Sequence, residues 1–180
     1  GVQTCALPIF IDGSATHRVI KCVKGESRET IIEDVELRNG FNAQFGGGMY
    51  IKNSRPLLKN CVFTANETPF NGGGIYIASN SNPKLIRCQF AHNKSTATRT
   101  EGFLGGGAIC VDASNPVIDR CAFTNNQALM GGALGIVNGG SDRETVVTSS
   151  TFSSNLGITL GGAVYVESSP LLMTDVTMTL

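Results

Sequence analysis

The fold is decided by residues 72–93, which read GGGIYIASNSNPKLIRCQFAHN. Glycines open this stretch, a short alternating apolar segment follows, and a Ser-Asn-Pro turn leads to a second apolar segment that ends in Cys-x-Phe-x-x-Asn. The same order recurs along the chain. Its glycine clusters begin at Gly46, Gly72, Gly105, Gly131 and Gly161, at successive spacings of 26, 33, 26 and 30 residues. Such a period of turns and apolar segments indicates a repeat architecture.

The segment after each glycine cluster predicts a strand with one face in a core, because its first and third residues are apolar. The side chains expected to point inward are Met49, Ile51, Ile75, Ile77, Ala108, Cys110, Leu134, Ile136, Val164 and Val166. The residues between them are expected to point outward and are Tyr50, Tyr76, Ile109, Gly135 and Tyr165.

The second half of each unit carries three further recurring positions. A phenylalanine recurs as Phe63, Phe90, Phe123 and Phe152. An asparagine follows each of them three residues later, as Asn66, Asn93, Asn126 and Asn155. A cysteine precedes three of the phenylalanines, as Cys61, Cys88 and Cys121.

One such unit cannot bury its own apolar face, so it must stack on copies of itself. The sequence therefore predicts an all-β fold, a right-handed parallel β-helix solenoid of about six coils with about three short strands each. Residues 10–180 are expected to form this single domain, as a stretch of a longer solenoid. Residues 1–9 resemble a translated sequencing-adapter scar and are left out of the fold argument.

The four Phe-x-x-Asn motifs, in register with the Gly-Gly-[Gly/Ala]-apolar clusters, resemble the repeats of chlamydial polymorphic outer-membrane proteins. They are also similar to the wider set of secreted right-handed parallel β-helix proteins of pectate-lyase-like fold. The resemblance covers about residues 31–180. It implies an extracellular or cell-surface location, associated with the outer membrane in bacteria, and a passenger that often serves as an adhesin.

The recurring positions predict ladders along the solenoid. The phenylalanines should stack in the core, where each buried ring contributes about 1.5–3 kcal/mol. The asparagines should form an amide ladder at a turn, where Asn tolerates a left-handed conformation. The cysteines should be buried and reduced, because parallel side chains in register keep their Cβ atoms about 4.8 Å apart, beyond disulfide range. No metal site is expected, since the chain has no Cys-x-x-Cys motif and no nearby histidine pair.

The charge and the hydropathy of the chain limit the kinds of partner that it is expected to bind. The chain has 14 Lys and Arg residues and 14 Asp and Glu residues, so its formal net charge is zero. It therefore has no strong positive electrostatic field that would attract nucleic acid. No apolar run approaches the roughly 18 residues that a membrane helix needs. The expected partners are a surface glycan, a host or neighbouring cell surface, and flanking β-helix coils.

An enzyme is the alternative, because pectate-lyase-like folds host polysaccharide lyases and hydrolases. The candidate catalytic residues are Arg87 and Arg120, which precede the recurring cysteines, with Asp112 and Asp119 nearby in sequence. In a polysaccharide lyase, one of these arginines could act as the base beside an acidic sugar that is bound through calcium. Calcium is expected only if the protein is such a lyase, and otherwise no cofactor is expected. The paired-aspartate and His-Gly motifs of polygalacturonases are absent. No two of the Asp residues past the leading coil occupy equivalent positions of adjacent coils, so a non-catalytic segment is favoured.

Two features are candidates for binding. The segment Lys94–Leu104, with Thr98, Arg99 and Glu101, is about six residues longer than the corresponding turns of its neighbours, and function concentrates in loops on rigid scaffolds. The other feature is the outward column with Tyr50, Tyr76 and Tyr165, whose stacked rings could bind sugars. The sequence thus predicts an adhesin-like display segment or a glycan-contacting stalk.

Overall fold

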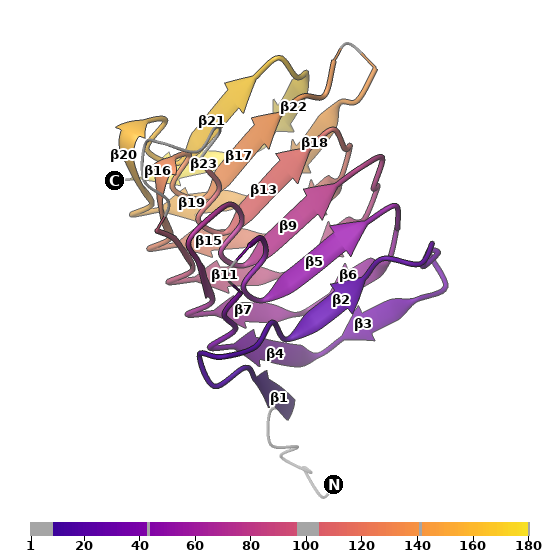
Figure 1. Cartoon of the computed structure of the whole chain (residues 1–180). Helices are drawn as coiled ribbons and strands as arrows, with labels where there is room; N and C mark the ends of the chain where they lie inside the picture. The colour runs from indigo at the N-terminus through magenta and orange to yellow at the C-terminus, as the bar shows by residue number, and fades with distance from the viewer. Residues whose placement is uncertain (1–8, 43, 97–104, 141, 180) are drawn as a thin grey trace, which may run out of the picture.

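The computed structural model describes residues 9–42, 44–96, 105–140 and 142–179 of the chain. All 23 regular elements among them are strands, and every strand pairing is parallel. Figure 1 shows the strands stacked as successive coils from the N-terminal β1 to the C-terminal β22 and β23. The all-β parallel solenoid of about six coils is confirmed.

The chain passes through four sheets in turn, and the first two meet at a corner that bears the recurring Pro. Sheet 1 contains β2 (Ile20–Cys22), β5 (Met49–Lys52), β9 (Ile75–Ala78), β13 (Ile109–Asp112), β17 (Leu134–Val137) and β21 (Val164–Glu167). Sheet 2 contains β3 (Ile31–Glu33), β6 (Leu57–Lys59), β10 (Lys84–Ile86), β14 (Val117–Asp119), β18 (Thr145–Thr148) and β22 (Leu171–Thr174).

The other two sheets follow on either side of the recurring asparagine. Sheet 3 contains β1 (Ile9–Asp12), β4 (Val35–Arg38), β7 (Val62–Thr64), β11 (Gln89–Ala91), β15 (Ala122–Thr124), β19 (Thr151–Ser153) and β23 (Thr177–Thr179). Sheet 4 contains β8 (Glu67–Thr68), β12 (Lys94–Ser95), β16 (Gln127–Met130) and β20 (Leu156–Leu160). Sheet 4 was not predicted, because its first strands are too short to show an alternating pattern.

The predicted phenylalanine column forms the centre of the core on sheet 3. Phe63, Phe90, Phe123 and Phe152 are at most 1% exposed. Successive ring centroids lie 4.9, 4.9 and 4.5 Å apart, with planes within 7° of parallel. The strand register places each ring directly over the next, so burial and ring stacking act together.

The predicted amide ladder is also present. Asn66 Nδ2 donates to Asn93 Oδ1 at 2.9 Å, Asn93 Nδ2 to Asn126 Oδ1 at 3.0 Å, and Asn126 Nδ2 to Asn155 Oδ1 at 2.9 Å. The expectation of a left-handed backbone at these asparagines is wrong by one residue. The positive φ angles belong to the preceding residues, at 52°, 57°, 54° and 51°, and these residues are Ala65, His92, Asn125 and Ser154.

The recurring cysteines are buried free thiols, as predicted. The Cys88 side chain is fully buried, and hydrogen bonding with the Cys121 thiol is the main cause that raises its pKa to about 12. The Cys61 thiol pKa is likewise raised, chiefly by its contact with Cys88 and then by burial. Cys61 and Cys88 therefore stay protonated and act as small core side chains.

Six of the predicted inward side chains are fully buried in the main core at the expected strand positions, and they are Met49, Ile51, Ile75, Ile77, Leu134 and Ile136. In the last unit Val164 packs partly buried against the core, and Val166, which pairs with Ile136, is 37% exposed.

The prediction for the third unit is wrong by one residue. Ile109 pairs with Ile75 and points into the core, and Val111 is its inward partner. Cys110 therefore lies on the outer face beside Tyr76, whereas Ala108, at the corner before the strand, is buried in the main core as predicted. The cause is an extra glycine. The corner requires a positive φ, which is found at Gly106 with 71°, and the sequence pattern was read from Gly105.

Candidate functional site

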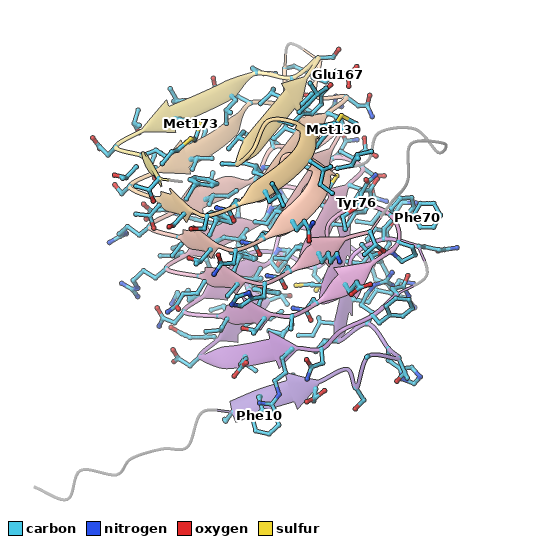
Figure 2. All side chains as sticks on the ribbon, turned by 90° about the vertical axis from the view of Figure 1, so that its left-hand side faces the viewer. Phe10, Phe70, Tyr76, Met130, Glu167 and Met173 are labelled. Carbon is cyan, nitrogen blue, oxygen red and sulfur yellow. The ribbon has the colours of Figure 1, made fainter. Side chains whose placement is uncertain are left out.

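An aromatic patch, which we define as Phe45, Tyr50, Phe70 and Tyr76, covers part of the outer face of sheet 1. Tyr50 and Tyr76 stack with centroids 5.8 Å apart, and Phe45 stacks on Tyr76 at 4.6 Å. Phe70 meets Phe45 at 5.5 Å in a tilted arrangement. Figure 2 shows Phe70 and Tyr76 on the same side of the solenoid. The patch thus presents three half-buried rings around one buried tyrosine.

Sequence reasoning identified the two tyrosines of the patch and missed its two phenylalanines. Both phenylalanines lie within two residues before a positive-φ glycine, Phe45 before Gly46 and Phe70 before Gly72. An aromatic residue just before a corner glycine is therefore the signal that would have located them. The corner turns these rings onto the outer face of sheet 1.

The tyrosines do not form the exposed column that the sequence predicted. Tyr76 is only 6% exposed, because Phe45, Tyr50 and Cys110 pack around it. Its hydroxyl donates to Asp112 Oδ2 at 2.6 Å, and burial raises its pKa. Tyr165 lies two coils beyond Cys110 in the same column, where its hydroxyl donates to Glu167 Oε2 at 3.2 Å. Tyr50 remains the half-exposed tyrosine next to the patch phenylalanines.

Arg18 anchors the edge of the aromatic patch. Its Nε donates to the Gly46 carbonyl at 2.8 Å, and its Nη2 donates to the Phe45 carbonyl. Its guanidinium carbon lies 5.0 Å from the centre of the Tyr50 ring, within cation–π range. Burial lowers the pKa of this arginine, although not its charge at neutral pH. Sequence reasoning did not single out Arg18.

The arginines considered for a lyase occupy turn positions between sheets 2 and 3. Arg87 and Arg120 have φ angles of 52° and 53°, and each is the first of the two residues that join the strands. Arg87 Nε donates to Asn60 Oδ1 at 2.9 Å. Arg120 forms an ion pair with Asp119 at 2.7 Å, and this hydrogen-bonded contact lowers the pKa of Asp119.

The two aspartates considered with these arginines lie on different sheets. Asp119 ends β14 in sheet 2, where it also accepts a hydrogen bond from Thr148 Oγ1 at 2.9 Å. Asp112 ends β13 in sheet 1, where Tyr76 and Asn138 donate to its two carboxylate oxygens. The structure therefore joins Asp119 with Arg120 and separates Asp112 from both.

The long segment Lys94–Leu104 is placed only in part. Lys94 and Ser95 form β12, and Gly105 N donates to Asn71 Oδ1 at 2.9 Å after the segment. Residues 97–104 lie outside the described residues. The binding candidates Thr98, Arg99 and Glu101 fall within that range, so their proposed role stays a prediction.

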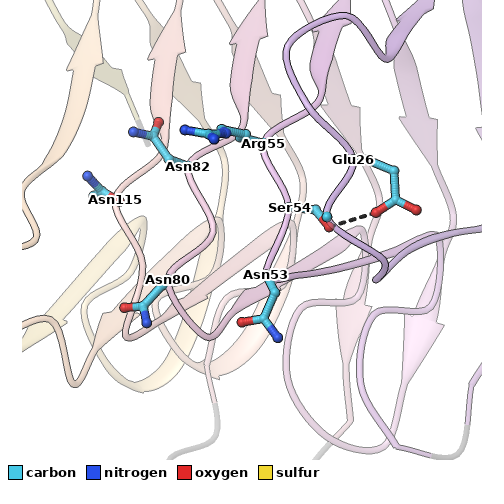
Figure 3. A pocket seen from close by; sticks show the side chains of 8 residues that line it. Glu26, Asn53, Ser54, Arg55, Asn80, Asn82 and Asn115 are labelled. Atoms are coloured by element: carbon cyan, nitrogen blue, oxygen red, sulfur yellow. Dashed lines mark hydrogen bonds between the residues drawn. The ribbon is translucent and has the colours of Figure 1, made fainter.

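A polar groove of about 430 Å³ lies at the corner between sheets 1 and 2 (Figure 3). Its lining residues are Gly25, Glu26, Asn53, Ser54, Arg55, Asn80, Asn82 and Asn115. Ser54 is buried, and its hydroxyl donates to Glu26 Oε2 at 2.7 Å. That bond is the main cause that lowers the Glu26 pKa to about 2, so its carboxylate stays ionised. Sequence reasoning read this corner as a turn and did not predict a groove.

A comparison of the chain with known protein families agrees with this arrangement of strands and corners. Residues 9–171 match the family described as right handed beta helix region. The chain belongs to this family. No curated protein and no solved structure matches this β-helix protein.

Metal sites and membrane-spanning helices are two further features that bear on function. The described residues contain no group of three or more His, Cys, Asp or Glu side chains placed to hold a metal ion. No helix long and apolar enough to cross a membrane occurs in the part of the chain that the structure describes. The aromatic patch and the polar groove are its candidate sites.

Proposed function

We propose that this β-helix protein is a non-catalytic extracellular or cell-surface segment that contacts glycans through its aromatic patch. It serves as a stalk or as an adhesin-like display surface. The observation that carries the proposal is the placement of the patch: half-buried aromatic rings, fixed by Arg18, stand on a rigid sheet. Such a segment benefits from a rigid contact surface, because side chains that are already ordered lose little conformational entropy on binding.

The ladders support the stalk part of the proposal. The phenylalanine stack and the amide ladder run through four successive coils without a break. Each coil contacts mainly its neighbours, so stability accumulates coil by coil along the axis. Such a body holds its surface features at fixed spacing, which suits presentation to another surface.

The chemistry of the patch supports a glycan as the contact. A sugar ring has an apolar face of C–H groups and a rim of hydroxyls. The rings of Phe45, Tyr50 and Phe70 offer apolar area, and Arg18 and the Tyr50 hydroxyl offer hydrogen-bonding groups at the edge. A surface with both features is suited to the amphipathic ring of a saccharide.

The non-catalytic part of the proposal is supported by the contacts of the catalytic candidates. Arg120 is paired with Asp119, Arg87 is bound to Asn60, and Asp112 accepts hydrogen bonds from Tyr76 and Asn138. Glycoside hydrolysis needs two carboxylates within about 5–10 Å across the scissile bond. The candidate carboxylates Asp112 and Asp119 belong instead to different sheets, each with its own protein partners.

The test is retention of the whole chain on glycan-coated beads and on cells. The double variant Phe45→Ala, Phe70→Ala is expected to weaken retention by about tenfold, because it removes two of the three half-buried rings that the patch presents. Phe10→Ala is the matched control, since Phe10 is an exposed ring under Arg38, 3.6 Å from the guanidinium carbon, in β1 of sheet 3 at the N-terminal edge of the solenoid. Equal retention by the double variant and the control would refute the role of the patch.

A further inference from the structure

The polar groove has a regular construction across three successive coils. Arg55, Asn82 and Asn115 occupy equivalent corner positions, because Asn82 N donates to the Ser54 carbonyl at 3.2 Å and Asn115 N to the Ser81 carbonyl at 3.1 Å. Figure 3 shows Arg55, Asn82 and Asn115 along one side of the groove, with Asn53 and Asn80 opposite. Four asparagines and one arginine therefore line the same hollow.

Two of these amides are oriented by arginines. Arg28 Nη2 donates to Asn82 Oδ1 at 2.9 Å, and Arg143 Nε donates to Asn80 Oδ1 at 2.8 Å. Because the amide oxygens accept these bonds, the Nδ2 groups of Asn80 and Asn82 are the atoms left to donate to a ligand. The amide orientation is thus fixed before a ligand arrives.

The remaining lining groups keep their hydrogen-bonding capacity. Within the described residues the side chains of Asn53, Arg55 and Asn115 make no recorded hydrogen bond. Glu26 holds its Oε2 against Ser54 and the Lys24 amide, which leaves Oε1 as an acceptor at one end of the groove. Donors and an ionised acceptor therefore line the same space.

The charges around the groove cancel. Glu26 and Arg55 line it, and Arg28 and Glu29 line an adjoining hollow that shares Arg55 and Asn82. Arg143, which orients Asn80, has its own partner, Asp142, at 3.6 Å. Two carboxylates thus accompany the two arginines next to the groove, so it holds no excess charge to select an anion.

We propose that the polar groove is a binding subsite for an uncharged saccharide, held through its ring hydroxyls. Neighbouring hydroxyls of a sugar each donate and accept, which matches planar amides, a guanidinium and a carboxylate side by side. Successive coils repeat these groups about every 4.8 Å along the axis, so a linear chain of sugar residues can lie along the groove. The inference rests on the proposed glycan contact and adds to it a second site with a defined ligand chemistry.

The lining also argues against an apolar ligand or a peptide side chain as the occupant. Of its eight lining residues, seven carry a polar or charged side chain and the eighth is Gly25. An apolar group placed there would strip water from these groups without replacing their hydrogen bonds. Hydroxyls replace that water with equivalent bonds.

The experiment is titration calorimetry of the whole chain with cellohexaose and mannohexaose as neutral probes and a galacturonic-acid hexamer as the acidic probe. The groove variant is Asn53→Ala, Asn115→Ala. Asn53 has a φ of 50°, and the equivalent position of the third coil is occupied by Ala113 at 47°, so alanine is compatible with this backbone. Asn125→Ala is the matched control, because Asn125 is another left-handed asparagine, on the far side of the coil, and Ala65 occupies its equivalent position.

The expected result is binding of a neutral hexasaccharide that the groove variant weakens by about tenfold, through loss of two hydrogen bonds. The control and the Phe45→Ala, Phe70→Ala variant should retain that binding. Loss of binding only in the aromatic variant would overturn the groove and leave the proposed function standing. Binding of the acidic hexamer alone, weakened by salt, would overturn the uncharged ligand. If no probe binds the wild-type chain, the groove fails, and retention on cells still tests the proposed function separately.

Discussion

Asn93→Ala removes the central member of the amide ladder. The Asn93 side chain accepts hydrogen bonds from the backbone and the amide of Asn66, at 3.1 and 2.9 Å. It donates to the Phe63 carbonyl at 2.8 Å and to Asn126 at 3.0 Å. All four bonds are buried, and each contributes about 0.5–1.5 kcal/mol net, with an added cost where a buried donor is left unpaired. We expect the free energy of unfolding to fall by about 3–5 kcal/mol, a large part of the roughly 5–15 kcal/mol of a typical domain.

The assay is equilibrium unfolding in urea, followed by circular dichroism, with two reference variants. Asn155→Ala removes the half-exposed end of the ladder, where water can replace the lost bonds, and should cost about 1 kcal/mol. It remains measurable even if Asn93→Ala does not fold. Asn125→Ala changes an exposed neighbour outside the ladder and should stay within about 0.5 kcal/mol of the wild type. Equal costs for Asn93→Ala and Asn125→Ala would refute the view that the ladder stabilises the coils.

Three other predictions concern single groups. Thr145→Val should raise the free energy of unfolding by about 1 kcal/mol in the same urea assay, because the Thr145 hydroxyl is buried without a recorded partner; a loss of stability would show an unrecognised bond. Cys88 should resist iodoacetamide at pH 8 in the native chain and react fully in urea without reductant, since its pKa is raised to about 12; a disulfide-linked peptide would contradict this. Glu26 should titrate near pH 2 by carbon NMR of its carboxyl group, so its contribution to stability is present above its usual pKa of 4.5 and is lost as pH falls toward 2. Ser54→Ala should move that pKa upward; an unchanged value would refute the hydrogen bond as its cause.

The sequence predicted the fold because the same positions recur in every coil. The Phe-x-x-Asn motif locates both the stacked rings and the amide ladder, since in-register pairing transmits one residue type along a column. The register of the third unit could not be read in the same way. Three glycines stand at Gly105, Gly106 and Gly107, and only the backbone shows that Gly106 takes the positive φ.

The sequence predicted less of the candidate site than of the fold. The aromatic patch combines Tyr50 and Tyr76, which a strand pattern reveals, with Phe45 and Phe70, which lie in corners and follow no alternation. The polar groove joins residues of different coils, and its Arg55 stands where the next two coils carry Asn82 and Asn115. Pairwise contacts such as Asp112 with Tyr76 also depend on the register that the third unit obscured.

The central claim is that this β-helix protein contacts glycans without cleaving them. The most direct measurement is mass spectrometry of polysaccharides recovered after incubation with the whole chain, with and without calcium. The account predicts that bound acidic and neutral polysaccharides are recovered with unchanged mass. Unsaturated products or new reducing ends, abolished by Arg87→Ala or Arg120→Ala, would contradict it.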